Sequence, residues 1–193
     1  MVSGQFATHP RNSPKVDMQA ATHLINNCIG LLRQAVDLIE RIDDEVYAAK
    51  TPISARCSVG GHLRHILDCY LNFLAGIETG QIDYNLRKRD SLIARNRTFA
   101  IERIESTIDR LSGLSLPNEG ATLLVTTEED GSSPPLVCRS SVLRELDFLQ
   151  SHTIHHYSLV AILLRLQEID PGEGFGVAPS TRNYWSREAQ CAR

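Results

Sequence analysis

The sequence predicts an all-α protein, a four-helix bundle with a short β-hairpin-like insertion between its third and fourth helices. Apolar residues recur every three or four positions through four long segments, as in helices that bury one face. A single intervening stretch, residues 113–138, holds two short apolar runs around a polar turn instead. We expect a flexible leader (1–15), the bundle (16–170) and a C-terminal tail containing Gly and Pro (171–193).

Turn-forming residues bound the first two helices. The first is predicted over residues 16–49. It is predicted to end before Pro52, because proline cannot continue the helical hydrogen-bond ladder. The second is predicted from Ser58, a typical N-cap, to residue 78, and Gly80 ends it.

The second half of the chain contains the other two helices and the insertion. Residues 81–86 are predicted to be a connection, and the third helix is predicted over residues 90–111. The runs 122–126 and 135–138 predict the two strands of the hairpin. The fourth helix is predicted over residues 141–168. A bundle is the natural architecture for four such helices.

Composition excludes several classes of partner. The formal net charge is −3, and the densest basic cluster is only Arg87-Lys88-Arg89, so we expect no nucleic-acid binding. No run approaches the roughly 18 apolar residues that cross a bilayer, so we expect no membrane association. The five cysteines are scattered without a C-x-x-C pair, and the leader lacks an apolar segment; both features predict a cytoplasmic protein. The apolar helical faces are also compatible with a homodimer.

Histidines are concentrated in two of the predicted helices. His152 and His156 are four residues apart, so they lie on one helical face, beside the buried stripe. Two imidazoles placed in this way can bind one divalent ion, and the second helix offers His62 or His65 as a third ligand. Spacing alone does not choose between these two.

Three neutral imidazoles with an open position are typical of a catalytic metal site. Zinc is the default metal, with nickel or another transition metal as alternatives. His62 and His155 are candidates for proton transfer or for orienting a nucleophile. Cys69 could serve as a soft ligand, although a buried cysteine more often acts as a small hydrophobic residue.

Two segments carry a resemblance to a known family. These are Ser58-Val-Gly-Gly-His-Leu-Arg-His65-Ile-Leu-Asp68 and Ser151-His-Thr-Ile-His-His-Tyr157. They resemble the DinB/YfiT-like superfamily, and the similarity extends over roughly residues 20–168. The resemblance implies a four-helix bundle with unusual connectivity and one divalent metal ion, often zinc or nickel. Matched position by position, it implies His65, His152 and His156 as the metal ligands.

The resemblance also suggests a type of activity. Members of this superfamily include transferases that use a low-molecular-weight thiol such as bacillithiol, mycothiol or glutathione. We therefore expect a metal-dependent enzyme acting on a small molecule, of the thiol S-transferase or hydrolase type. The alternative is a non-catalytic, metal-stabilised bundle that acts as a binding or stress-related module.

Overall fold

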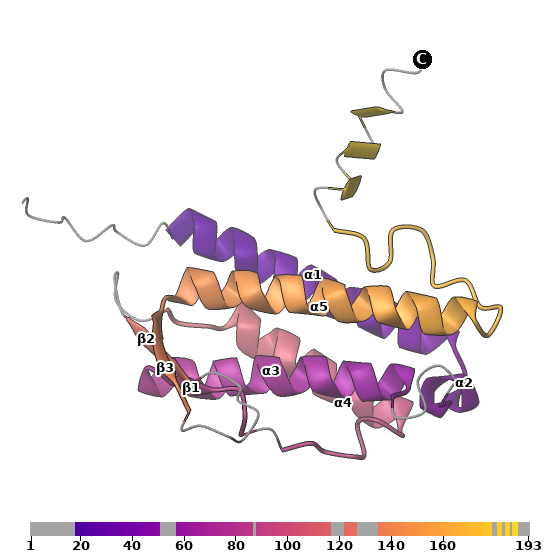
Figure 1. Cartoon of the computed structure of the whole chain (residues 1–193), viewed down its shortest axis with the longest axis horizontal. Helices are drawn as coiled ribbons and strands as arrows, with labels where there is room; N and C mark the ends of the chain where they lie inside the picture. The colour runs from indigo at the N-terminus through magenta and orange to yellow at the C-terminus, as the bar shows by residue number, and fades with distance from the viewer. Residues whose placement is uncertain are drawn as a thin grey trace, which may run out of the picture.

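The computed structural model describes residues 18–50, 57–86, 88–116, 122–126, 135–178, 181–182, 184–185 and 187–188. The predicted leader (1–15) therefore lies outside the described residues. Within them, the chain forms five helices and one three-stranded sheet (Figure 1). The prediction of a mostly helical protein is confirmed, and the small sheet is larger than the predicted hairpin by one strand.

Four long helices make the body of the molecule. They are α1 (Met18–Arg41), α3 (Val59–Thr79), α4 (Arg97–Ser112) and α5 (Val142–Arg165). Helix α1 packs against α5 and α4, and α3 packs against the same two helices, so the four surround a common core (Figure 1). In the part of the chain that is described, no helix combines the length and apolarity needed to cross a membrane.

The first predicted helix is interrupted. Helix α1 ends at Arg41, and the short helix α2 (Asp44–Ala48) begins after Asp43, whose side chain accepts a hydrogen bond from the Val46 amide. Arg97, at the start of α4, donates to the carbonyl groups of Ile39 and Ile42 at the end of α1. The break is thus fixed by an N-cap on one side and by a guanidinium on the other.

The sheet lies at one end of the helices. Strands β2 (Leu123–Thr126) and β3 (Val137–Ser140) pair antiparallel, as the predicted hairpin requires. Strand β1 (Gln81–Asp83) pairs parallel with β2, although the sequence predicts only a connection over these residues. The chain enters β1 through Gly80, which adopts a left-handed conformation with φ of 75°.

The start of the predicted tail packs against α5. The Phe175 ring stacks on the Tyr157 ring, with centroids 4.6 Å apart and planes 15° apart. The Ser158 hydroxyl donates to the Gly176 carbonyl at 2.7 Å, and Arg41 donates to the Pro171 carbonyl at 2.9 Å. Residues 171–178 are therefore a part of the folded body.

Close packing at the start of α3 gives a test of the fold. A Cβ atom at Gly60 would lie 2.4 Å from the Ala94 carbonyl oxygen and 2.5 Å from a ring carbon of Tyr47. We expect Gly60→Ala to lower the free energy of unfolding by about 1–3 kcal/mol through overpacking, measured by denaturant titration.

Gly30 in α1 is the matched control, because nothing lies within 4 Å of the position that a Cβ atom would take there. Gly30→Ala should raise stability by about 0.5–1 kcal/mol, since alanine favours a helix over glycine. Equal effects of the two substitutions would contradict this packing of α3.

Candidate metal centre

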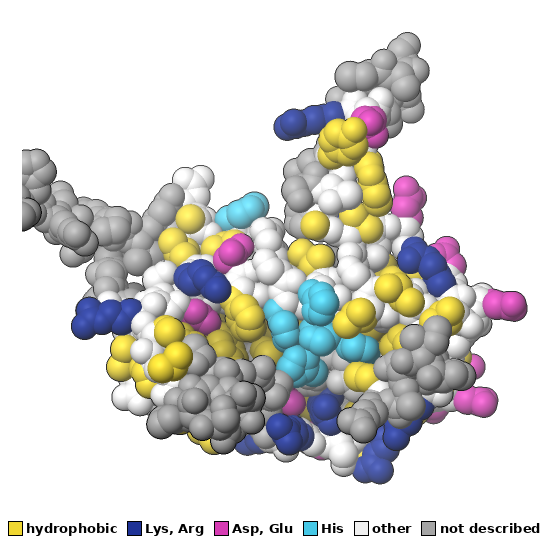
Figure 2. All heavy atoms as spheres, viewed as in Figure 1, with side chains coloured by type: hydrophobic (Ala, Val, Ile, Leu, Met, Phe, Trp, Pro, Cys, Tyr) yellow, Lys and Arg dark blue, Asp and Glu magenta, His cyan; other side chains and the backbone are white. Residues whose placement is uncertain are grey.

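Histidines from two helices meet on one face of the molecule. His62 and His65 come from α3, and His152, His155 and His156 come from α5. Figure 2 shows imidazole side chains gathered there in one patch. All five are candidate site residues by sequence, and the structure brings them into one neighbourhood.

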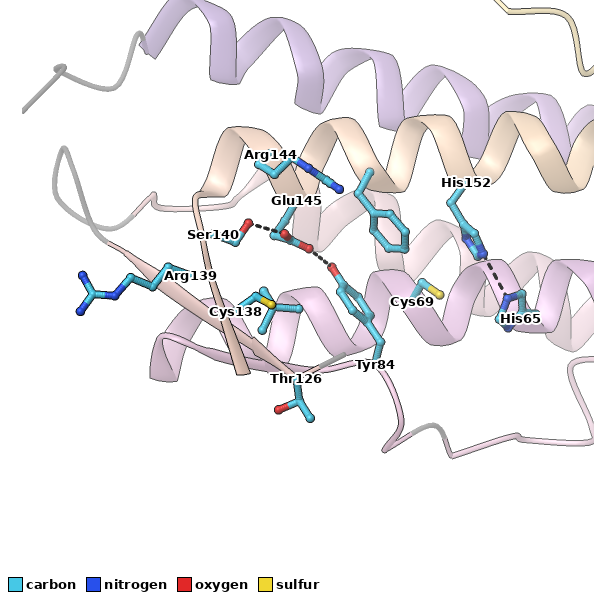
Figure 3. Close-up of a pocket in the computed structure, with 12 residues that line it drawn as sticks. His65, Cys69, Tyr84, Thr126, Cys138, Arg139, Ser140, Arg144, Glu145 and His152 are labelled. Atoms are coloured by element: carbon cyan, nitrogen blue, oxygen red, sulfur yellow. Dashed lines mark hydrogen bonds between the residues drawn. The ribbon is translucent and has the colours of Figure 1, made fainter. Parts of the chain in front are cut away.

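Three imidazole nitrogens converge. The Nε2 atom of His152 lies 3.1 Å from Nε2 of His65 and 3.1 Å from Nε2 of His156 (Figure 3 shows the first pair). A tetrahedral zinc ion with Zn–N bonds of 2.0–2.1 Å separates its nitrogen ligands by about 3.3 Å. The spacing of these nitrogens therefore suits a shared ion as well as it suits hydrogen bonds.

His156 uses both of its ring nitrogens within this cluster. Its Nδ1 atom lies 2.9 Å from Nδ1 of His62, on the side opposite its contact with His152. His62 is buried, with 8% of its surface exposed. His155 is exposed, and its ring centroid lies 5.2 Å from that of His156, so it stands at the solvent side of the cluster.

The environment favours the neutral form of two of these imidazoles, His156 and His62. Burial, and then the neighbouring His152, His65, His62 and His155, lower the pKa of His156 to about 3. Burial also lowers the pKa of His62. A neutral imidazole has the free lone pair that a metal ion requires, so these two rings need not lose a proton to bind a metal near neutral pH.

A cysteine joins the same group. His65, Cys69 and His152 each offer a ligand atom, and these atoms lie within 4.8 Å of one another, so this group could hold a metal ion. Cys69 is nearly fully buried. The sequence favours a small hydrophobic role for it, with metal ligation as the lesser possibility. Its position four residues after His65, on the same helical face, is the signal for the ligand role.

Buried hydroxyl groups hold α5 in place beside the histidines. The Thr153 hydroxyl donates to the Leu149 carbonyl at 2.7 Å and contacts the Tyr70 hydroxyl of α3 at 3.3 Å. The Tyr157 hydroxyl donates to the Leu31 carbonyl of α1 at 2.6 Å. Thr153 and Tyr157 each follow a histidine directly, so the bonds that fix α5 also fix the direction of His152 and His156.

A cavity of about 460 Å³ opens beside the histidines and extends to the sheet (Figure 3). His65, Cys69 and His152 line one end of it. Its remaining described walls come from the β strands, from the segment after β1 and from the first turns of α5: Tyr84, Val125, Thr126, Cys138, Arg139, Ser140, Arg144, Glu145 and Phe148.

The far end of the cavity contains a buried carboxylate. Glu145 is 4% exposed, and it accepts hydrogen bonds from the Tyr84 hydroxyl at 2.8 Å and the Ser140 hydroxyl at 2.5 Å (Figure 3). Burial, and then the adjacent Glu145, raise the pKa of Tyr84 far above its usual range, so this hydroxyl stays protonated and remains a donor. Glu145 is not among the site residues that the sequence predicts.

These features define a mostly helical protein with a His/Cys group that could hold a metal ion. No protein-family model matches the chain, and no solved structure matches it. The chain is 28% identical over 170 residues to "FK506-binding protein 5" of Rhizopus delemar. That alignment covers 85% of the chain but 38% of the relative, so the chain spans well under half of the relative's length.

The Tyr84–Glu145 pair gives a test of the cavity wall. Tyr84→Phe removes one of the two hydroxyl donors to a buried carboxylate. We expect it to lower the free energy of unfolding by about 1–3 kcal/mol, because a buried acceptor loses its partner. The exposed pair of Tyr184 and Glu188, with a hydrogen bond of 2.6 Å, is the control. Tyr184→Phe should change stability by less than about 0.5 kcal/mol; a similar cost for both variants would contradict the burial of Glu145.

Proposed function

We propose that this chain is a DinB/YfiT-like protein that binds one divalent metal ion and acts as a metal-dependent enzyme on a small molecule. Zinc is the favoured metal, with nickel or another transition metal as alternatives. The reaction is of the thiol S-transferase or hydrolase type. The observation that carries the proposal is the convergence of three imidazole nitrogens next to a cavity of substrate size.

The proposed ligands are His65, His152 and His156. The nitrogen of His156 lies as close to His152 as that of His65 does, at 3.1 Å. The ligand atoms of the group that includes Cys69 spread over as much as 4.8 Å, which is wider than the edge of a compact coordination sphere. Cys69 is therefore the competing third ligand, and His156 is preferred because of its 3.1 Å approach to His152 and because the DinB/YfiT-like resemblance implies it.

Other residues of the cluster have supporting roles in this proposal. With Nε2 of His156 directed at the ion, its Nδ1–H would donate to Nδ1 of His62, which fixes the tautomer and the ring orientation of the ligand. His62 is thus a positioning residue. His155, which is exposed beside His156, is placed to exchange protons with solvent. The ion itself, when bound, would supply Lewis acidity that activates a thiol or a water at neutral pH.

The cavity favours an enzyme over a metal-stabilised module. A purely structural site is closed around its ion, whereas a catalytic site keeps an open position. Here the cavity reaches His65 and His152 directly, so a small molecule could approach the proposed ligands. The fourth position would then be available to a thiol or to a water.

Elemental analysis of purified protein tests the metal proposal. Wild-type protein should carry one equivalent of a divalent transition metal, and His65→Ala and His156→Ala should each lose most of it. Cys69→Ser should retain it. Full metal content in both histidine variants would contradict the ligand assignment, and loss in Cys69→Ser with retention in His156→Ala would identify cysteine as the third ligand.

His62→Ala distinguishes a positioning residue from a ligand. We expect it to keep one equivalent of metal at saturation but to weaken metal affinity by about 10–100-fold, measured by competition with a chelator. The control is His23→Ala, because His23 is an exposed histidine of α1 whose ring contacts the Asn27 side chain. Unchanged affinity in His62→Ala would remove its positioning role.

Turnover tests the enzymatic part of the proposal. Wild-type protein should catalyse one of two reactions. The first is the reaction of a small thiol with 1-chloro-2,4-dinitrobenzene, in which the S–C bond forms, chloride leaves and the thiol proton passes to buffer. The second is the hydrolysis of p-nitrophenyl acetate by water to p-nitrophenol and acetate. Activity should disappear with a chelator, return with added zinc and be absent in His65→Ala. If chelation only lowers the melting temperature and neither reaction is catalysed, the non-catalytic module is the correct interpretation.

A further inference from the structure

We infer that the cavity beside the histidines binds an apolar, preferably aromatic, molecule that carries one carboxylate, with the carboxylate at Arg144 and the ring system directed along Phe148 toward His65 and His152. The binding of this molecule to the cavity does not depend on the proposed function. Only the further step, that the bound molecule is a substrate of the proposed enzyme, rests on it.

The size and the walls of the cavity suit a ring system. About 460 Å³ is within the range of small-molecule sites, which are mostly apolar with a few placed polar groups. The Tyr84 and Phe148 rings lie 5.1 Å apart, and Phe148 stacks on His152 with centroids 5.3 Å apart and planes 21° apart. These rings form a continuous aromatic wall from the sheet to the histidines, against which a flat molecule can stack.

The charges in the wall favour an anionic ligand. The charged lining residues that the structure describes are Glu145, Arg144 and Arg139. Glu145 already accepts hydrogen bonds at both of its oxygens, from Tyr84 and Ser140, so each carboxylate oxygen has a partner within the protein. A ligand cation would have to compete with these two donors.

Arg144 is the cation placed to receive a carboxylate. Its guanidinium carbon lies 5.9 Å from the centre of the Phe148 ring, over the aromatic wall, and the residue is exposed (Figure 3). A guanidinium can bind a carboxylate through two parallel hydrogen bonds. The Arg139 guanidinium, in contrast, extends away from the histidine end of the cavity (Figure 3).

The spacing along α5 sets the length of the ligand. Arg144, Phe148 and His152 are each four residues apart, so their side chains follow one another along one face of the helix. Eight residues of α-helix span about 12 Å. A molecule of one or two rings with a terminal carboxylate can thus reach from Arg144 toward the proposed metal ligands.

Binding of three matched probes tests this inference. Affinities of full-length protein for 2-naphthoate, 2-naphthamide and 2-naphthylmethylamine can be measured by isothermal titration calorimetry. We expect 2-naphthoate to bind most tightly. Arg144→Gln should weaken 2-naphthoate binding by about tenfold and leave 2-naphthamide unchanged. Arg139→Gln, which removes the same charge from the same cavity, should change neither affinity by more than about twofold.

Several results would overturn the inference: no binding of 2-naphthoate, tighter binding of the amine, or unchanged 2-naphthoate affinity in Arg144→Gln. The same titrations in His65→Ala separate the inference from the proposed function. If the carboxylate were held by a metal ion, 2-naphthoate affinity would fall in His65→Ala and be insensitive to Arg144. If the wild-type protein held no metal, the dependence on Arg144 would still stand, and only the metal proposal would fail.

Discussion

The packing of α3 against α5 buries His62 and half-buries His65, His152 and His156, and this constraint shapes the rest of the site. A buried ring nitrogen without a partner is costly, so imidazoles in such a position must satisfy one another, the surrounding protein or an ion. Here Nε2 of His152 contacts Nε2 of both His65 and His156, and His156 in turn contacts His62. Within hydrogen bonds alone, Nε2 of His152 would have to be the donor to one or both of these neighbours, or the acceptor from them. In the proposed function, a bound cation would take the place of these hydrogen bonds.

The histidines can keep this arrangement because one face of α5 is bonded to the core and the adjacent face carries the histidines. Thr153 and Tyr157, which are fully buried, point into the core and bond to α3 and α1. His152 and His156 precede them and are only half-buried, at the edge of the cavity and the solvent. One face therefore holds the helix, while the adjacent face remains available for ligands. The Phe175 ring covers Tyr157 from the outside and completes this support.

Much of the fold could be predicted from local patterns. Ser58 and Gly80 bound α3 as expected, because an N-cap hydroxyl and a left-handed glycine are local signals. The break at Asp43 was missed, since the apolar periodicity of α1 continues through Ile42 and only the capping role of Asp43 reveals the interruption. Strand β1 was missed because a strand of three residues has too little alternation to recognise, and its partner β2 lies far along the chain, with Gln81 opposite Leu124.

In the site too, local features could be predicted from the sequence and long-range contacts could not. The shared face of His152 and His156 follows from helical geometry alone. Spacing left His62 and His65 undecided, and the structure gives both a place: His65 against His152, and His62 against the outer nitrogen of His156. The contacts of Cys69 and Glu145 could not be predicted, because they cross the cavity between α3, α5 and the sheet. Which three residues are ligands remains a prediction.

The parallel pairing of β1 with β2 has a consequence for how the molecule folds. Parallel strands require a crossover, and here the crossover contains α4. The cavity and the histidine cluster both join segments that are distant in the chain, such as His65 and His152. Contacts of this kind carry an entropic cost, because a long loop must close before they contribute. The contact between His65 and His152 needs both α3 and α5, so the histidine cluster cannot be complete before α5 has been synthesised.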